Sequence, residues 1–182
     1  MIFQKASFLL VLFLSACSEL DQNKYSPPTS EAKNINFIML DKSKDLIWPS
    51  LIDLTKEYSG VSVNNKEHLI IIDLILPDVS KYINCGMMND EIYVDYIHRI
   101  FESTLTAKLY IRLDEIDINR SNIQLDASYT FISLESGTTW EFSSNKPATI
   151  WVANPAEGAS PQRICVSKNT IETNFINKIM SL

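Results

Sequence analysis

Two stretches in the middle of the chain alternate strictly between apolar and polar residues. The first is TLTAKLYIRL, residues 104–113, and the second is IQLDASYTFIS, residues 123–133. A period of two residues is typical of β-strands that pack one face on a core and expose the other face to water. A turn near residues 119–122 joins the two stretches, so the pattern predicts a long antiparallel hairpin.

Shorter stretches of similar character predict the rest of a sheet. The alternation returns in TTWEFSS, residues 138–144, and again in ATIWVAN, residues 148–154. The run HLIIIDLIL, residues 68–76, is apolar enough for a central strand. Residues 91–101, EIYVDYIHRIF, have a mixed pattern that fits a strand or a partly helical segment.

Two further segments show the helical spacing of apolar residues. Within residues 44–60, apolar side chains at positions 47, 51, 54 and 58 form one stripe, with Asp45 able to cap the helix and Gly60 able to end it. The closing segment, residues 169–182, carries a second stripe. Asn169, with Glu172 three residues later, has the spacing of a capping pair at its start.

This order of elements predicts an α+β fold: an antiparallel β-sheet with the N-terminal and C-terminal helices packed on one face. One face of the sheet should be buried against the stripes Leu51-Leu54-Tyr58 and Phe175-Ile176-Ile179. A register shift of one residue would expose the whole set on that face. The residues expected there are Leu105, Leu109, Ile111, Ile123, Leu125, Tyr129, Phe131, Trp140 and Phe142.

The first residues have the pattern of an export signal. After one positive charge, Lys5, residues 6–14 are almost all apolar, a run too short for a bilayer, which needs about 20 apolar residues. Two small residues then precede Cys17, as in front of a signal-peptide cut site. The quartet Leu14-Ser15-Ala16-Cys17 resembles the lipobox of bacterial lipoproteins. The alternative is an ordinary signal peptide with a chance cysteine.

The lipobox resemblance implies that the chain is cut before Cys17 and that this cysteine carries two or three acyl chains. One chain alone binds a membrane only marginally, so the implied anchor is stable. Ser18 follows, where enterobacterial lipoproteins of the inner membrane have aspartate, and this implies sorting to the outer membrane. The chain then divides into a signal peptide (1–16), a lipidated N-terminus with a flexible polar tether (17–36) and a single periplasmic α+β domain (37–182).

The charge of the chain limits its partners. The formal charge of −6 becomes −7 once residues 1–16 are removed, because they contain one lysine and no acid. Binding to nucleic acid or to anionic lipid needs clustered Lys and Arg. We therefore expect no nucleic-acid partner, and we expect the acyl chains to make the membrane contact.

Cys85 and Cys165 are expected to form a disulfide, because an exported chain meets an oxidising compartment and Cys17 is taken by the lipid. The alternative is a nucleophilic thiol or a metal pair. The chain has no CxxC spacing, and neither His68 nor His98 lies at ligand spacing to a cysteine. We expect no metal and no cofactor.

The remaining candidates for chemistry are few. The sequence has no G-x-S-x-G, no H-E-x-x-H and no phosphate loop. Asp114, Glu115 and Asp117 fit a solvated hairpin end, whereas glycoside hydrolysis needs two carboxylates that face one cleft. Met87 and Met88, in CGMMNDE, are polarizable side chains suited to partner contacts, or else core residues near the disulfide.

From residue 45 to the end, the element order resembles a known family. A helix that carries Trp48, an apolar strand, the Cys85-Gly86 pair, long hairpins and a closing helix look like the helix-grip domain of BamC-type outer-membrane lipoproteins. The closing RICVSKNTIE, residues 163–172, is similar to unnamed proteobacterial lipoproteins. BamC-type proteins usually have two such domains and a long N-terminal segment, and this chain has room for one, so a role in barrel assembly does not follow.

These features lead to a non-enzymatic, lipid-anchored binding or scaffold module at the outer membrane. Two alternatives stay open, a periplasmic carrier of an apolar ligand and an envelope hydrolase. An enclosed apolar pocket would favour the carrier, and a cleft with converging ionisable groups would favour the hydrolase. A filled core with an exposed apolar patch or a free strand edge would favour a protein partner.

Overall fold

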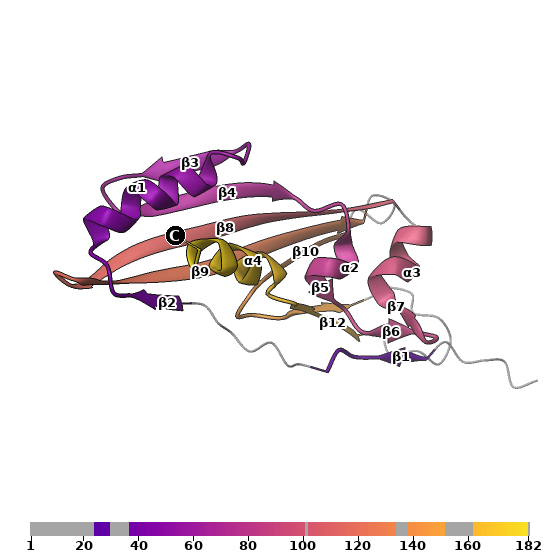
Figure 1. The fold of residues 1–182 in the computed structure, drawn as a ribbon. Helices are drawn as coiled ribbons and strands as arrows, with labels where there is room; N and C mark the ends of the chain where they lie inside the picture. The colour runs from indigo at the N-terminus through magenta and orange to yellow at the C-terminus, as the bar shows by residue number, and fades with distance from the viewer. Residues whose placement is uncertain (1–23, 30–36, 101, 134–137, 152–161, 182) are drawn as a thin grey trace, which may run out of the picture.

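The structure is a computed structural model that describes residues 24–29, 37–100, 102–133, 138–151 and 162–181. The expected signal peptide and Cys17 lie outside these residues, as does most of the expected tether. Figure 1 shows a long, twisted antiparallel sheet with two helices across one face and a smaller group of short strands and helices at one end. The fold is therefore the expected α+β arrangement.

The long hairpin forms the centre of the largest sheet. Strand β8 (Ser103–Asp117) pairs with β9 (Arg120–Ser133) from Ser103–Ser133 to Asp117–Arg120. The turn is Ile118–Asn119, slightly earlier than the sequence pattern indicated. The strands added on either side give the order β10-β9-β8-β4-β3, and β2 pairs with the first part of β9. These strands are β2 (Phe37–Leu40), β3 (Val61–Asn64), β4 (Leu69–Ile75) and β10 (Thr138–Ser143).

One face of this sheet is the core, as predicted. All nine residues expected on the buried face are at most 6% exposed. The alternate residues of the same strands, such as Thr106, Lys108 and Gln124, lie on the outer face and are exposed. A shift of one residue would exchange the two sets, so the unbroken alternation determines the register of the sheet.

Helices α1 (Lys44–Thr55) and α4 (Thr170–Ile179) cover the core face (Figure 1). Ile47 and Leu51 of α1, and Phe175 of α4, are buried against the sheet. The first helix begins after Ser43 rather than Asp45 and ends at Thr55, five residues before Gly60. Burial of these apolar side chains supplies most of the stability of such packing, because an isolated helix of this length is marginal in water.

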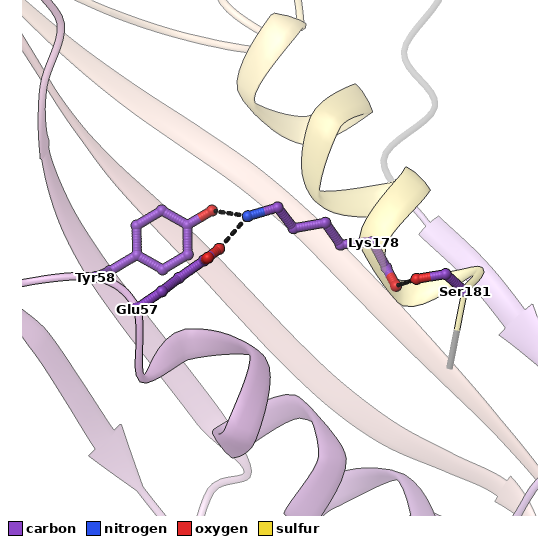
Figure 2. Close-up of polar contacts among 4 residues, drawn as sticks. All are labelled: Glu57, Tyr58, Lys178 and Ser181. Carbon is purple, nitrogen blue, oxygen red and sulfur yellow. Dashed lines mark hydrogen bonds and ion pairs between the residues drawn. The ribbon is translucent and has the colours of Figure 1, made fainter.

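Polar contacts join the C-terminal ends of the two helices (Figure 2). The Lys178 ammonium pairs with the Glu57 carboxylate and donates a hydrogen bond of 2.9 Å to the Tyr58 hydroxyl. The Ser181 hydroxyl donates to the Lys178 carbonyl oxygen at 2.6 Å. Hydrogen bonding from Lys178 lowers the pKa of Glu57. These groups are exposed, and exposed ion pairs contribute little to stability, so the contacts position the helix ends more than they stabilise them.

The second part of the domain consists of short elements. Strands β11 (Ala148–Trp151), β12 (Gln162–Ser167) and β5 (Ile83–Asn84) form one three-stranded sheet, and β1, β6 and β7 form another. Residues 91–101, for which the sequence left two readings, contain both. They begin with β7 (Glu91–Ile92) and continue as helix α3 (Tyr93–Ile100). A short helix, α2 (Val79–Tyr82), precedes β5.

Part of the expected tether belongs to the folded domain. Tyr25 and Ser26 form strand β1, which pairs antiparallel with Met88 and Met87 of β6 (Met87–Met88). The polar composition and the two prolines of the segment predicted a flexible chain, but the Tyr25 ring is half-buried against the core of the domain. Residues 24–29 are therefore a docked segment rather than part of a flexible tether. This conclusion concerns these six residues alone.

Candidate functional site

Exposed apolar side chains gather at the closed end of the long hairpin. Figure 1 places the start of α1, strand β2 and the β8–β9 turn together at this end. Four of the large apolar side chains there are 46–78% exposed. We call this group the hairpin-tip surface. Its members are Phe37, Met39, Ile116 and Ile118.

Strand β2 brings two of these side chains to the surface through its register with β9. Phe37 pairs with Gln124 and Met39 with Asn122, so both point to the outer face, whereas Ile38 packs toward the core. Among the described strands, β2 pairs with β9 alone, along one of its edges. The hairpin-tip surface therefore combines exposed apolar side chains with a strand edge that has no strand partner in the described part of the chain.

Two ion pairs lie close to the β8–β9 turn. Lys44 of α1 lies 3.5 Å from the Glu115 carboxylate, and Arg120 lies 2.6 Å from the Asp117 carboxylate across the turn. Hydrogen bonding from Arg120 and from the Asn119 amide lowers the pKa of Asp117. An apolar centre with a polar, solvated rim is the usual composition of a protein interface.

The three acids of the hairpin end do not form a catalytic pair. Asp114 and Glu115 are exposed on opposite faces of β8, and Glu115 and Asp117 each have a basic partner. A general acid needs a raised pKa, whereas that of Asp117 is lowered. The arrangement agrees with a solvated hairpin end.

A depression of about 890 Å³ lies mainly over the outer, polar face of the sheet. It is open to solvent, and two of its three acids have a basic partner: Glu57 pairs with Lys178, and Asp73 lies 3.2 Å from Lys108. The sheet residues at its wall are both polar and apolar: Asp73, Leu74, Ile75, Thr106, Ala107, Lys108, Ser128, Thr130 and Glu141. The depression is open and mixed in character, unlike the enclosed apolar pocket that a carrier of apolar ligands requires.

The two methionines proposed for partner contact have different environments. Met88 is 4% exposed and belongs to the core, whereas Met87, its neighbour in β6, is 37% exposed. Alternation along a strand explains the difference, because adjacent side chains point to opposite faces. Met88 is therefore a core residue, and only Met87 is accessible to a partner.

Cys85 and Cys165 form a disulfide, with their Cα atoms 4.0 Å apart and both residues fully buried. Cys165 lies in β12 and Cys85 directly follows β5, and these two strands pair through Val166–Asn84 and Ser167–Ile83. The disulfide thus crosses between neighbouring strands. Its full burial fits a structural bridge rather than a reactive thiol.

The two histidines are parts of the packing around them. The His68 ring lies edge-on to Trp48, with centroids 5.0 Å apart, and His98 Nδ1 lies 2.9 Å from the Ser103 hydroxyl. In the part of the chain that the structure describes, no group of three or more His, Cys, Asp or Glu residues is placed to hold a metal ion.

A buried polar cluster lies between α4 and the sheet, where the sequence predicted a helix cap. Asn169 is the N-cap residue of α4 but makes no side-chain capping bond. Glu172, fully buried, instead accepts a hydrogen bond from the Ser144 hydroxyl and one of 3.5 Å from the Tyr129 hydroxyl. The Ser167 hydroxyl in turn donates to the Tyr129 oxygen at 3.1 Å. The capping-pair prediction was wrong because Glu172 faces the core rather than the helix end.

This cluster makes folding stability sensitive to alkaline pH. Burial, and then the charge of Glu172, raise the pKa of Tyr129 well above its ordinary value of 10.0. The unfolded chain therefore loses this proton first, and the free energy of unfolding is expected to fall as the pH rises above about 10. Urea unfolding between pH 8 and pH 11 measures the fall.

Tyr129→Phe is expected to reduce the alkaline fall. Tyr110→Phe, at a half-buried tyrosine of the outer face, is the matched control and should keep it. Equal pH profiles for the two variants would contradict the assignment to Tyr129.

The comparisons with known proteins do not identify a family for this chain. No family model matches it, and neither the curated proteins nor the solved structures contain a significant match. None of the helices in the described residues is both long enough and apolar enough to cross a membrane.

Proposed function

We propose that this protein is a lipid-anchored lipoprotein of the outer membrane, facing the periplasm, and that it acts as a non-enzymatic binding or scaffold module. The observation that carries the proposal is the hairpin-tip surface, an exposed apolar group at one end of the domain. Isolated exposed apolar residues need no explanation, but a rimmed group of them is typical of an interaction site.

The anchor in this proposal is Cys17, on the evidence of the lipobox-like quartet that ends there. The disulfide supports export, because buried disulfides persist in oxidising compartments and are rare in the cytosol. The acidic chain, with its formal charge of −6, leaves the lipid as the source of membrane affinity.

The partner in this proposal is an envelope protein with an apolar surface of its own. Large side chains such as Phe37 and Met39 can enter pockets of a partner, while the charge pairs around them stay solvated. The edge of β2 that has no strand partner among the described residues adds backbone donors and acceptors that an extended segment of the partner can pair with.

Substitution of the hairpin-tip surface tests this function. Met39→Ser with Ile118→Ser is expected to lower recovery of the partner in mild detergent by at least tenfold, because both side chains are more than two-thirds exposed and contribute little to the fold. Ile75→Ser is the matched control, since Ile75 is 84% exposed but lies on β4 away from the hairpin turn.

Recovery of the partner by each variant is compared with recovery by the wild type. Equal recovery of the partner by Met39→Ser/Ile118→Ser and by the wild type would contradict the proposed surface. Loss of recovery in Ile75→Ser as well would show that the effect is not specific to the hairpin tip.

A further inference from the structure

The N-terminal segment is held by a specific site at the end of the domain opposite the hairpin tip. The Tyr25 ring lies 4.3 Å from the guanidinium carbon of Arg163, and edge-on to the Tyr93 ring at 5.7 Å. Its hydroxyl donates to the Cys85 carbonyl at 3.0 Å and accepts from the Ile164 amide at 3.0 Å. Tyr25 is therefore fixed through its ring and its hydroxyl, beside the disulfide.

The backbone of the segment is fixed as well. The Asn89 amide donates to the Lys24 carbonyl at 3.0 Å, and the Lys24 amide donates to the Asn89 side chain at 2.9 Å. At Gly86 a Cβ atom would lie 2.1 Å from the Ser26 carbonyl oxygen, so the segment passes directly over a position that only glycine fits. The site and the segment match closely enough that one added methyl group would displace the segment.

Docking at Tyr25 shortens the distance available between the proposed anchor and the domain. Tyr25 is eight residue steps from Cys17, a span of at most about 28 Å, whereas Phe37 is twenty steps from Cys17, a span of up to about 70 Å. The hairpin tip is far from this end, because β8 has 15 residues and is roughly 45 Å long. Figure 1 shows β1, β6, β7 and α3 at one end and the β8–β9 turn at the other.

Two exposed apolar side chains lie on the strands beside the docked segment, and a third lies on β11. Met87 pairs with Ser26 on one side and with Ile92 on the other, and Met87 and Ile92 are 37% and 38% exposed. Trp151 is 69% exposed and pairs with Gln162, the neighbour of Arg163. Tryptophan is enriched where proteins meet the membrane–water interface.

We propose that the docked segment holds this end of the domain against the lipid bilayer, with Trp151, Met87 and Ile92 at the bilayer surface and the hairpin-tip surface directed away from it. The inference rests on the proposed lipidation of Cys17. In this proposal the Tyr25 site shortens the tether between the lipid at Cys17 and the domain, and it fixes the direction in which the tether leaves the domain.

Quenching of tryptophan fluorescence tests the orientation. The full-length mature protein, extracted from membranes, is reconstituted into phosphatidylcholine vesicles that contain brominated acyl chains. The wild type is expected to float with the vesicles and to be quenched, and Trp151→Phe is expected to lose most of this quenching. Gly86→Ala is expected to float equally well but to lose the quenching, because its docked segment is displaced.

Gly60→Ala is the matched control for Gly86→Ala. Both glycines have positive φ, 91° and 83°, so alanine strains the backbone at either one, but the nearest atom to a Cβ at Gly60 is 3.2 Å away, on the Asp73 side chain. The tryptophan fluorescence of Gly60→Ala should be quenched as strongly as that of the wild type. Tyr25→Ala, which alters the docked segment and leaves the domain core intact, should behave like Gly86→Ala and guards against a folding defect in that variant.

The possible results distinguish a failure of the proposed orientation from a failure of the proposed lipid anchor. Flotation without quenching in the wild type, or wild-type quenching in both Gly86→Ala and Tyr25→Ala, would overturn the orientation and leave the lipid anchor standing. A wild type that does not float would contradict the lipid anchor itself, and the orientation with it.

Discussion

Removal of the Cys85–Cys165 disulfide is expected to lower the free energy of unfolding by about 2 to 5 kcal/mol. The bridge closes a loop with a sequence separation of 80, for which the chain-entropy estimate is about 4.5 kcal/mol. Both cysteines are fully buried, so Cys85→Ala with Cys165→Ala also loses packing between β5 and β12. Urea unfolding at neutral pH measures the loss.

The control for this loss uses the same protein in reducing conditions. All variants carry Cys17→Ala, so that no third thiol interferes. The parent protein, which carries Cys17→Ala alone, should lose free energy of unfolding when a reductant is added and approach the value of the double variant. The free energy of unfolding of the double variant should not change. A double variant within about 0.5 kcal/mol of the oxidised parent would show that the bridge is not structural.

Cys17→Ala is expected to abolish membrane attachment. The lipobox-like quartet implies that Cys17 carries the acyl chains, and each buried methylene contributes about 0.8 kcal/mol to binding, so the loss of two or three chains leaves no comparable source of affinity. Cell fractionation measures the shift from the membrane fraction to the soluble fraction.

Ser18→Ala is the matched control for this experiment, since it changes the neighbouring residue and keeps the cysteine. It should stay with the membrane, and the N-terminal peptide of the wild type should begin at an acylated Cys17. If Cys17→Ala remains membrane-bound and is cut at the same place, the chain is not a lipoprotein of this kind.

The central sheet was predictable because its signal is local and repeated. In β8 and β9 every second residue is apolar over ten residues or more, so both the strands and their buried face follow from the chain itself. The disulfide was predictable from the export that the N-terminal pattern implies and from the number of cysteines. The nine buried residues confirm the register that this pattern implies.

The features that the sequence did not reveal depend on contacts between distant residues. Strand β1 is two residues long within a polar, proline-containing segment, and its site consists of Arg163, Tyr93 and the Cys85 carbonyl, which lie 60 residues or more along the chain. Burial of Glu172 likewise depends on Ser144, 28 residues earlier. A local signal did exist at Gly86, one of four glycines, next to a cysteine.

The hairpin-tip surface was also missed, for a different reason. Ile116 and Ile118 lie beyond Leu113, where the alternation of β8 ends and a register irregularity falls between Glu115 and Asp117. Their exposure depends on how far the helices reach over the sheet. Alternation predicts which side a residue faces and not whether another element covers it. The sequence therefore drew attention to Met87 and Met88, and the structure shows that Met88 is covered and that Ile118 is 78% exposed.

Site-specific photo-crosslinking in cells tests whether the proposed lipoprotein binds an envelope protein through its hairpin tip. A photoreactive amino acid replaces Ile118 in one strain and Ile75 in another, both of them highly exposed isoleucines. The account predicts one discrete adduct with an envelope protein at position 118, none at position 75, and loss of the adduct in the Cys17→Ala background. No adduct at position 118, or the same adduct at both positions, would contradict it.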